Sequence, residues 1–182
     1  MTNPIETTKK WMKQFVIGMN FCPFAKNPFE ADTIRYVLVE DTDIQGLGEK
    51  LVAELRYLAN TPASKVETTL LIHPSLLLNF EEYLNFLEVT SYLLEEYELE
   101  GIIQVASFHP DYQFDGTELE DVENYTNRSP YPMLHLLRES SVSWAVATYP
   151  EVEKVPARNI QYLKTLGLAV IKQQWDEVKG TH

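Results

Sequence analysis

Three short apolar runs alternate with longer helical segments, and this alternation limits the possible folds more than any other feature of the sequence. The runs span residues 33–39, 68–72 and 102–108 and are rich in β-branched and aromatic side chains, as strands are. Apolar residues with helical spacing fill the intervals at 43–59 and 79–98. Strand, helix, strand, helix, strand is typical of βαβ units, so we expect an α/β domain with a small, mainly parallel sheet.

Further helices are expected before the first strand and after the third strand of the chain. The first begins at a capping box formed by Asn3 and Glu6, with Pro4 at the first helical position. The spacing of apolar residues predicts flanking helices at 3–19, 133–139, 141–148 (or a short strand at 141–144) and 157–166. The tail after Gly167 is expected to be strand-like or frayed. No linker or repeat divides the chain, so residues 1–182 are interpreted as one domain, with a ferredoxin-like antiparallel arrangement as the main alternative.

Charge and composition exclude several classes of protein. The net charge is −12, and residues 66–127 contain fourteen Asp or Glu and no Lys or Arg. Such an acidic chain repels the phosphate backbone, so we expect no nucleic-acid partner. One cysteine leaves no internal disulfide, and neither a signal peptide nor a membrane-spanning run is evident. These features predict a cytoplasmic protein without membrane contacts, and they leave the oligomeric state open.

Two histidines occupy the positions where a parallel sheet would place a site. His73 and His109 each directly follow an apolar run and precede a proline. The carboxyl ends of parallel strands open on the same edge, where such folds bind ligands, so both side chains are candidates for acid and base chemistry. The alternative is that each His-Pro pair only ends a strand, with the imidazole bound to a main-chain carbonyl.

Cys22 is the candidate nucleophile or thiolate. It lies in a non-helical segment, because Pro23 and Pro28 interrupt any helix there. A reactive thiolate needs a cation or a histidine nearby, which Lys26 or His109 would supply. A small buried hydrophobic side chain is the competing interpretation.

Basic side chains in an acidic protein suggest that an anion is recognised. Arg128 is the first Lys or Arg after Lys65 and lies in a long polar loop beside Asn127. With Lys26 and Arg35 it could bind a carboxylate or phosphate, and Asn127 and Tyr112 of the same loop are expected to help. An arginine that binds loop carbonyls is the equal alternative. No nucleotide-binding motif is present.

A metal-dependent enzyme is the second interpretation. His135 and Glu139 are four residues apart and would share one face of the predicted helix. Together with His73 or His109 they could bind a divalent metal, since two histidines and a carboxylate commonly do so. An exposed, ion-paired helix face would explain the same spacing.

A non-catalytic protein-binding module is the third interpretation. The loop after His109 is rich in proline and tyrosine, and aromatic side chains are enriched at interfaces. This interpretation predicts an exposed patch formed by Tyr112, Tyr125 and Tyr131, without an enclosed pocket. The first interpretation is a small-molecule enzyme that acts on an anionic substrate. It instead predicts that Cys22 and Arg128 meet His73 and His109 at the C-terminal edge of the sheet.

Three stretches of the chain together resemble a known bacterial family. They are residues 18–25 (GMNFCPFA), 104–114 (QVASFHPDYQF) and 124–138 (NYTNRSPYPMLHLLR). The chain resembles, over nearly its whole length, the family called domain of unknown function 1415. The resemblance implies a single-domain cytosolic protein, and it assigns no reaction, fold or catalytic residue.

Overall fold

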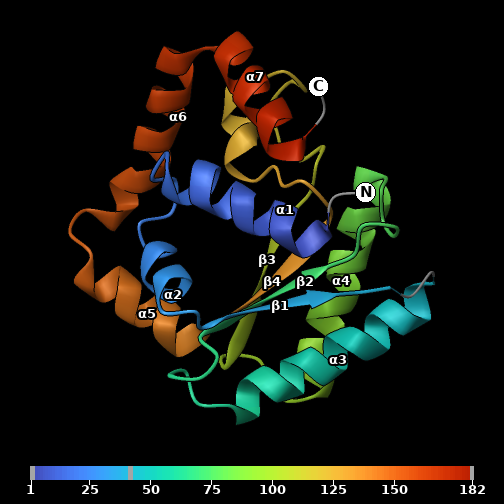
Figure 1. Ribbon diagram of the computed structural model, residues 1–182. Coiled ribbons are helices and arrows are strands. Elements are labelled where there is room, and N and C mark those ends of the chain that lie inside the picture. Colours follow the sequence, from blue (N-terminus) through green and yellow to red (C-terminus); the bar gives the residue numbers. More distant parts are fainter. Residues whose placement is uncertain (1–2, 41–42, 181–182) are drawn as a thin grey trace.

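A four-stranded sheet lies at the centre of the computed structural model, which describes residues 3–40 and 43–180 (Figure 1). Its strands are β1 (Ile34–Leu38), β2 (Thr68–Ile72), β3 (Ile103–Phe108) and β4 (Met133–Arg138), in the spatial order β1-β2-β4-β3. β1 pairs in parallel with β2, and β4 pairs antiparallel with both β2 and β3. The sheet is therefore mixed, with three strands running one way and β4 inserted against them.

The expected α/β class is confirmed, but the sheet is mixed rather than mainly parallel. Only one of the three strand pairs is parallel, because β4 enters between β2 and β3. The connection from β3 to β4 is the long loop 109–132. It returns the chain to the end of the sheet where β3 finishes, so that β4 runs back antiparallel to β3. The ferredoxin-like alternative does not fit either, since that motif runs β-α-β-β-α-β whereas this chain runs β-α-β-α-β-β.

The helix predicted at 133–139 is wrong, because residues 133–138 form β4. Leu134 and Leu136 are fully buried in the core on one face, and Met133 is buried in the core on the other. A strand buried on both faces reads as a continuous apolar run, and periodicity alone does not distinguish it from a buried helix. The three predicted strands agree with β1, β2 and β3 within a residue or two.

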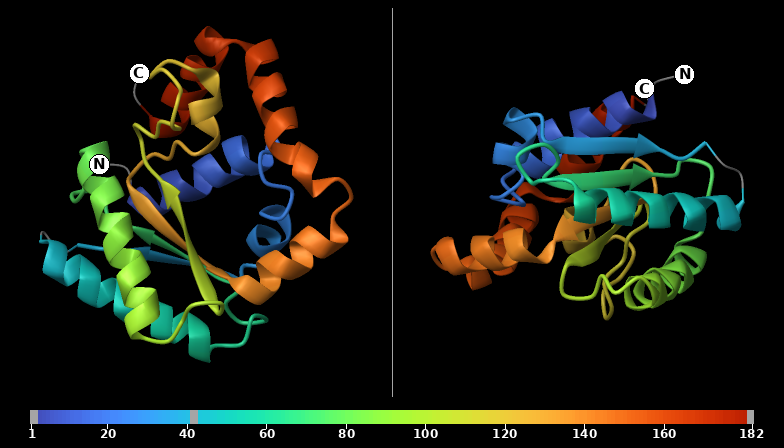
Figure 2. Two further views of the ribbon diagram at one scale, coloured as in Figure 1. Left: turned by 180° about the vertical axis from the view of Figure 1, so that it is seen from behind. Right: turned by 90° about the horizontal axis from the view of Figure 1, so that it is seen from below.

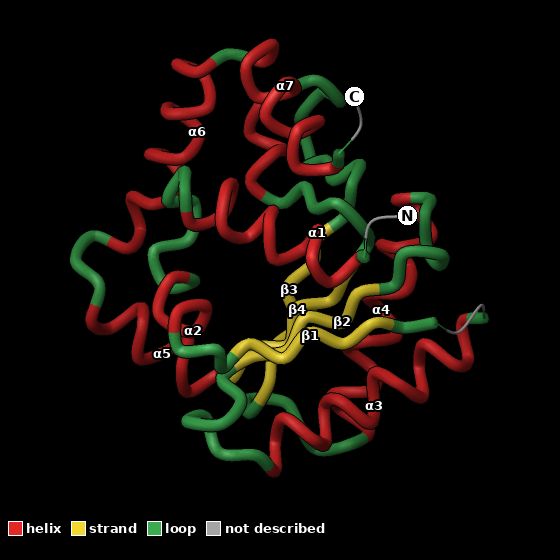
Figure 3. Tube along the Cα trace, in the orientation of Figure 1, coloured by secondary structure: helices red, strands yellow, loops and turns green. Residues whose placement is uncertain are grey.

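Helices cover both faces of the sheet and give the molecule three layers (Figures 2 and 3). The helices α3 (Ile44–Asn60) and α4 (Phe80–Glu96) lie on one face, while α1 (Pro4–Trp11), α6 (Val155–Leu166) and α7 (Leu168–Lys179) lie on the other. The remaining elements are α2 (Lys26–Glu30), α5 (Glu139–Thr148), the π-helix η1 (Met12–Ile17) and the 3₁₀ turns η2 (Val122–Thr126) and η3 (Val152–Lys154). Among the described residues, no helix is both long and apolar enough to cross a bilayer.

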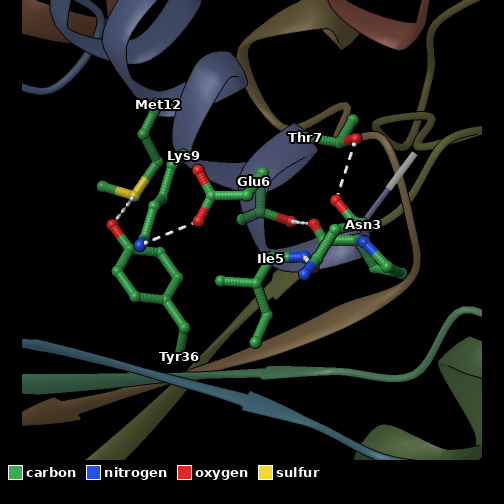
Figure 4. A network of polar contacts seen from close by, with 9 residues as sticks. Asn3, Ile5, Glu6, Thr7, Lys9, Met12 and Tyr36 are labelled. Atoms are coloured by element: carbon green, nitrogen blue, oxygen red, sulfur yellow. Dashed lines mark hydrogen bonds and ion pairs between the residues drawn. The ribbon is translucent and has the colours of Figure 1, made fainter.

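Helix α1 begins at the predicted cap and docks on the sheet. The side chain of Asn3 accepts from the Ile5 amide at 2.9 Å, as Figure 4 shows. Directly after α1, at the first residue of η1, the sulfur of Met12 lies 3.4 Å from the Tyr36 hydroxyl of β1 (Figure 4). The first helix is thereby fixed both at its start and against the first strand.

Local signals also place the starts of the two helices on the other face. Asn79 caps α4 by accepting from main-chain amides of its first turn, and Asp43 caps α3 in the same way. Thr42, the other candidate cap of α3, lies outside the described residues. Both helix starts therefore follow from single polar side chains that the sequence shows directly.

The tail after Gly167 is helical, which contradicts the strand-like or frayed prediction. Helix α7 begins directly after Gly167, whose φ of 81° turns the chain out of α6. Ile171, Trp175 and Val178 are buried on one face of α7 at helical spacing. The centroid of the Trp175 ring lies 5.3 Å from that of Phe15, so α7 completes the core on the α1 face of the sheet.

Candidate functional site

His73 and His109 meet at one edge of the sheet, as their sequence positions predict. They follow β2 and β3, which run in the same direction on either side of β4. Both side chains are fully buried. The ring of Tyr83 packs near both, with its centroid 6.1 Å from that of His73 and 5.1 Å from that of His109. The ring centroid of Phe80 lies 5.2 Å from that of His109 and 6.2 Å from that of Tyr83.

Tyr83 joins the two histidines to the strands. Its hydroxyl donates to the main-chain oxygen of Met133 at 2.8 Å and accepts from the amide of Phe108 at 3.0 Å. The end of β3 and the start of β4 are thereby tied to α4, and burial raises the pKa of the Tyr83 hydroxyl. The sequence alone gives Tyr83 no role beyond packing. The available signal is a tyrosine on a buried helix face, whose hydroxyl must find a partner.

Residues 74–79, here called the strap, connect β2 to α4. Both imidazoles form hydrogen bonds to main-chain oxygens of the strap. His73 Nδ1 lies 3.0 Å from the oxygen of Leu76, and His109 Nε2 lies 3.0 Å from the oxygen of Leu77. A carbonyl oxygen only accepts, so each of these nitrogens carries the proton. Leu77 has a φ of 54°, an uncommon conformation for a non-glycine residue that stores strain of about 1–3 kcal/mol.

The two imidazoles differ in their second nitrogen. His109 Nδ1 accepts from the amide of Asp111 at 3.0 Å, so both nitrogens of His109 are used inside the protein. His73 Nε2 is buried and has no hydrogen-bond partner among the described residues. Desolvation lowers the pKa of His73 to about 4 and also lowers that of His109, so both rings are neutral at physiological pH. The Nε2 lone pair of His73 is therefore buried at this end of the sheet without a hydrogen-bond donor among the described residues.

Arg128 comes to this edge but is occupied by its own loop. The main chain of His109 pairs with Asn127 and Ser129 on either side of Arg128, at 3.3 Å in each case. The guanidinium donates to the oxygens of Tyr112 and Leu119 at 3.3 and 2.6 Å. It also stacks 4.4 Å from the centroid of the Tyr125 ring. These contacts match the structural alternative, in which the arginine organises the loop.

Asn124 completes the organisation of the loop, and the sequence does not single it out. Its side chain is fully buried, accepts from the Phe114 amide and the Thr117 hydroxyl, and donates to the Glu118 oxygen. Asn127 donates to the Ser107 oxygen at 3.3 Å. A buried polar side chain that satisfies several main-chain groups fixes a loop that has no regular structure of its own.

The tyrosines of this loop do not form the exposed patch expected for a protein-binding module. Tyr125 is buried and packs edge-on against Trp175, while Tyr112 and Tyr131 are half-buried. The Tyr112 ring lies 5.3 Å from that of Phe80, which places it beside His109. Tyr112 is therefore part of the edge with the histidines, and its ring turns inward.

Cys22 and Lys26 lie at the opposite end of the sheet from the histidines. Cys22 precedes α2, which leads into the first residue of β1, whereas His73 follows the last residue of β2. Figure 1 shows α2 beside α5 at the end where β1 begins and β4 finishes. Burial raises the pKa of the Cys22 thiol, which opposes thiolate formation, and the exposed Lys26 pairs with Glu30. The structure thus does not bring Cys22 to a histidine of this edge.

The remaining predicted residues are also dispersed. Arg35 forms a two-pronged ion pair with the buried Glu54 of α3 at 2.7 and 3.1 Å. His135 lies within β4, where its Nε2 is 2.7 Å from the hydroxyl of Thr68. That hydroxyl donates to the Leu136 oxygen, so His135 Nε2 must donate to it, and desolvation lowers the pKa of His135 to about 4.

A metal centre built from His73, His109, His135 and Glu139 is not assembled. Glu139 begins α5 and does not share a helix face with His135. Within residues 3–40 and 43–180, no three His, Cys, Asp or Glu side chains lie close enough to hold a metal ion. The edge instead contains two neutral imidazoles, a tyrosine and aromatic rings under one strap.

A comparison with protein families matches this chain to the family described as protein of unknown function DUF1415, over residues 3–173. The chain belongs to the DUF1415 family. No curated protein and no solved structure shows significant similarity to it. The DUF1415 match includes all of the strap, both histidines and the Arg128 loop, and ends within α7.

Proposed function

We propose that the protein is a small-molecule enzyme whose proton-accepting group is His73, at the C-terminal edge of the sheet. The observation that carries the proposal is the lone pair of His73 Nε2, which is buried and has no partner among the described residues. Buried polar atoms are satisfied in most proteins, so an exception calls for a functional reason. A substrate O–H or N–H group would supply the missing donor.

The chemistry follows from the two ends of the imidazole. Nε2 would take a proton from the substrate or from an attacking water, which leaves the electron pair of the broken bond on the oxygen or nitrogen. Nδ1–H, held by the Leu76 oxygen, orients the ring and stabilises the imidazolium that forms. Arg128 takes no part in this step, since its guanidinium is bound to two loop carbonyls and a tyrosine ring.

The strap controls access in this proposal. In the closed form, desolvation keeps His73 neutral and weakly basic, with a pKa of about 4. Opening of the strap beyond Leu76, with the bond from Nδ1 to the Leu76 oxygen kept, would hydrate the ring. Its pKa would then move toward the ordinary value of about 6.5, near the pH where a general base works best. Leu77 stores strain in the closed strap and Leu78 beside it is 59% exposed, which favours opening. The buried side chains of Leu76 and Leu77 hold the strap closed in the absence of a substrate.

The test compares His73→Asn with His135→Asn. The asparagine amide in His73→Asn retains a donor for the Leu76 oxygen and removes the Nε2 lone pair, whereas His135 is an equally neutral imidazole elsewhere in the sheet. Each protein is incubated with a fractionated extract of small metabolites, and depletion is followed by mass spectrometry. We expect the wild type and His135→Asn to consume the same compound at similar rates. His73→Asn should consume it at least about 100-fold more slowly. Equal consumption by His73→Asn, or none by the wild type, would contradict the proposal.

A second candidate function, self-association, is favoured by α5. Ten residues long, α5 carries one formal charge, at Glu139, and buries only Ala145 among its described side chains. Trp144 is 69% exposed and Val146 is 52% exposed. A helix that carries no charge beyond its first residue is normally covered, so α5 has the composition of a helix that meets a partner.

A second copy of the chain is the partner that suits α5. The small exposed residues Ser143 and Ala147 flank Trp144, so two copies related by a two-fold axis could each place a tryptophan against small residues of the other. With a net charge of −12, two copies repel one another least across a face without charge. Light scattering after size exclusion should give a dimer for the wild type and a monomer for Trp144→Ser. A monomeric wild type would contradict this candidate.

A further inference from the structure

A groove of about 280 Å³ opens on the α1 side of the molecule, away from the histidines. Its walls are η1 with the residues after it, and the facing sides of α6 and α7. Gln14, Phe15, Gly18 and Met19 line it from the first wall, and Tyr162, Gln174, Glu177 and Val178 from the other two. At about 30 Å³ for each water, this volume equals that of roughly nine waters, which suits a small organic molecule.

The shape of the groove depends on a π-helix and one glycine. The widened turns of η1 end with the Gly18 amide bonded to the Lys13 oxygen at 3.1 Å, five residues back. A Cβ atom on Gly18 would lie 2.3 Å from the Gln14 oxygen, so no other residue fits without a backbone shift. π-helical turns are rare and are frequently found at functional sites, and glycine allows a ligand to approach the backbone.

The polar part of the groove carries a negative charge. Among its lining residues, Glu177 alone carries a formal charge, and it is negative. The side-chain oxygen of Gln174 is buried and has no hydrogen-bond partner within the described part of the chain. Lys10 donates to the main-chain oxygen of Glu177, and Gln173 lies 3.2 Å from its carboxylate, so no cation neutralises that carboxylate directly among the contacts described.

We propose that this groove binds a small organic cation, a primary amine or guanidinium on a short apolar stem. The cationic N–H groups would donate to the exposed carboxylate of Glu177, and to the buried oxygen of Gln174 once its side chain turns toward the groove. The stem would pack on the buried Phe15 and Val178. An anionic ligand would meet the Glu177 carboxylate and the overall charge of −12. This site is separate from the His73 edge, so the failure of either proposal leaves the other standing.

The probes for this site are three molecules of one shape: isoamylamine, isoamyl alcohol and isovalerate. Amide resonances of the intact protein are followed by two-dimensional NMR during titration with each probe. We expect saturable shifts at Gly18, Gln174 and Glu177 with the amine, and none with the alcohol or the carboxylate. Equal saturation by the alcohol, or no saturable shift with the amine, would overturn the proposal.

Two variants and a control identify the groups responsible. Glu177→Gln should weaken amine binding about ten-fold or more, because it removes a charge-assisted hydrogen bond. Gln174→Leu should also weaken binding while leaving the resistance to urea unchanged or higher, since it removes a buried oxygen that has no partner among the described residues. Glu95→Gln, which changes an exposed carboxylate on α4, is the matched control and should bind like the wild type. Equal losses in Glu177→Gln and Glu95→Gln would contradict a specific role for the groove.

Discussion

Acid should destabilise the protein through His73, and the size of the effect follows from its burial. The His73 pKa is about 4 in the folded protein and about 6.5 in an unfolded chain. Because the folded pKa is depressed, the unfolded state binds the proton first, and stability falls as pH drops from about 6.5 toward 4. The linkage relation gives a loss of about 2 kcal/mol from this one residue between about pH 7 and pH 5.

The assay is urea unfolding at about pH 7 and pH 5, with wild type, His73→Asn and Tyr83→Phe. Carboxylates and the other histidines titrate in all three proteins, so their contributions cancel in the comparison. The stability of His73→Asn should fall between the two pH values by about 2 kcal/mol less than that of the wild type. Tyr83→Phe disturbs the same cluster without titrating in this range, so its pH dependence should match the wild type. An equal fall in His73→Asn would refute a depressed pKa at His73.

Three further predictions concern single contacts. Arg128→Lys should lower the free energy of unfolding by about 2–3 kcal/mol, because lysine cannot reach two loop carbonyls and stack on Tyr125; an unchanged urea midpoint would contradict this role. Tyr83→Phe at neutral pH should lower it by about 1–3 kcal/mol, since the Phe108 amide loses its acceptor, and a fully stable variant would show that water replaces the hydroxyl. Cys22 should react with iodoacetamide at mildly alkaline pH much more slowly than free cysteine, because burial raises its pKa, and a rate equal to that of free cysteine would argue against this environment.

Local sequence signals are sufficient for most of the fold. The caps at Asn3 and Asn79 and the three β-branched runs specify their elements within a short window, and these elements appear as predicted. The prediction for residues 133–138 is wrong because a fully buried strand has no alternating pattern to reveal it. The sheet order depends on where the 109–132 loop returns the chain, which no local pattern encodes.

The candidate site is predictable only in part, for a similar reason. The position of His73 and His109 at one edge follows from strand direction and the His-Pro stops, and it holds in the structure. The expected approach of Cys22 and the free guanidinium of Arg128 depend on how loops fold. The strap bonds to the Leu76 and Leu77 oxygens use main-chain atoms, which any residue provides, so the sequence carries no signal for them.

The protonation state of the His73 ring decides whether Nε2 can accept a proton, and its measurement requires no substrate. Long-range ¹H–¹⁵N correlation of the imidazole rings, assigned with His73→Asn, reports which ring nitrogen carries the proton. We expect a neutral ring at about pH 6 with the proton on Nδ1 and an unprotonated Nε2. An imidazolium at that pH, or a proton on Nε2, would contradict it.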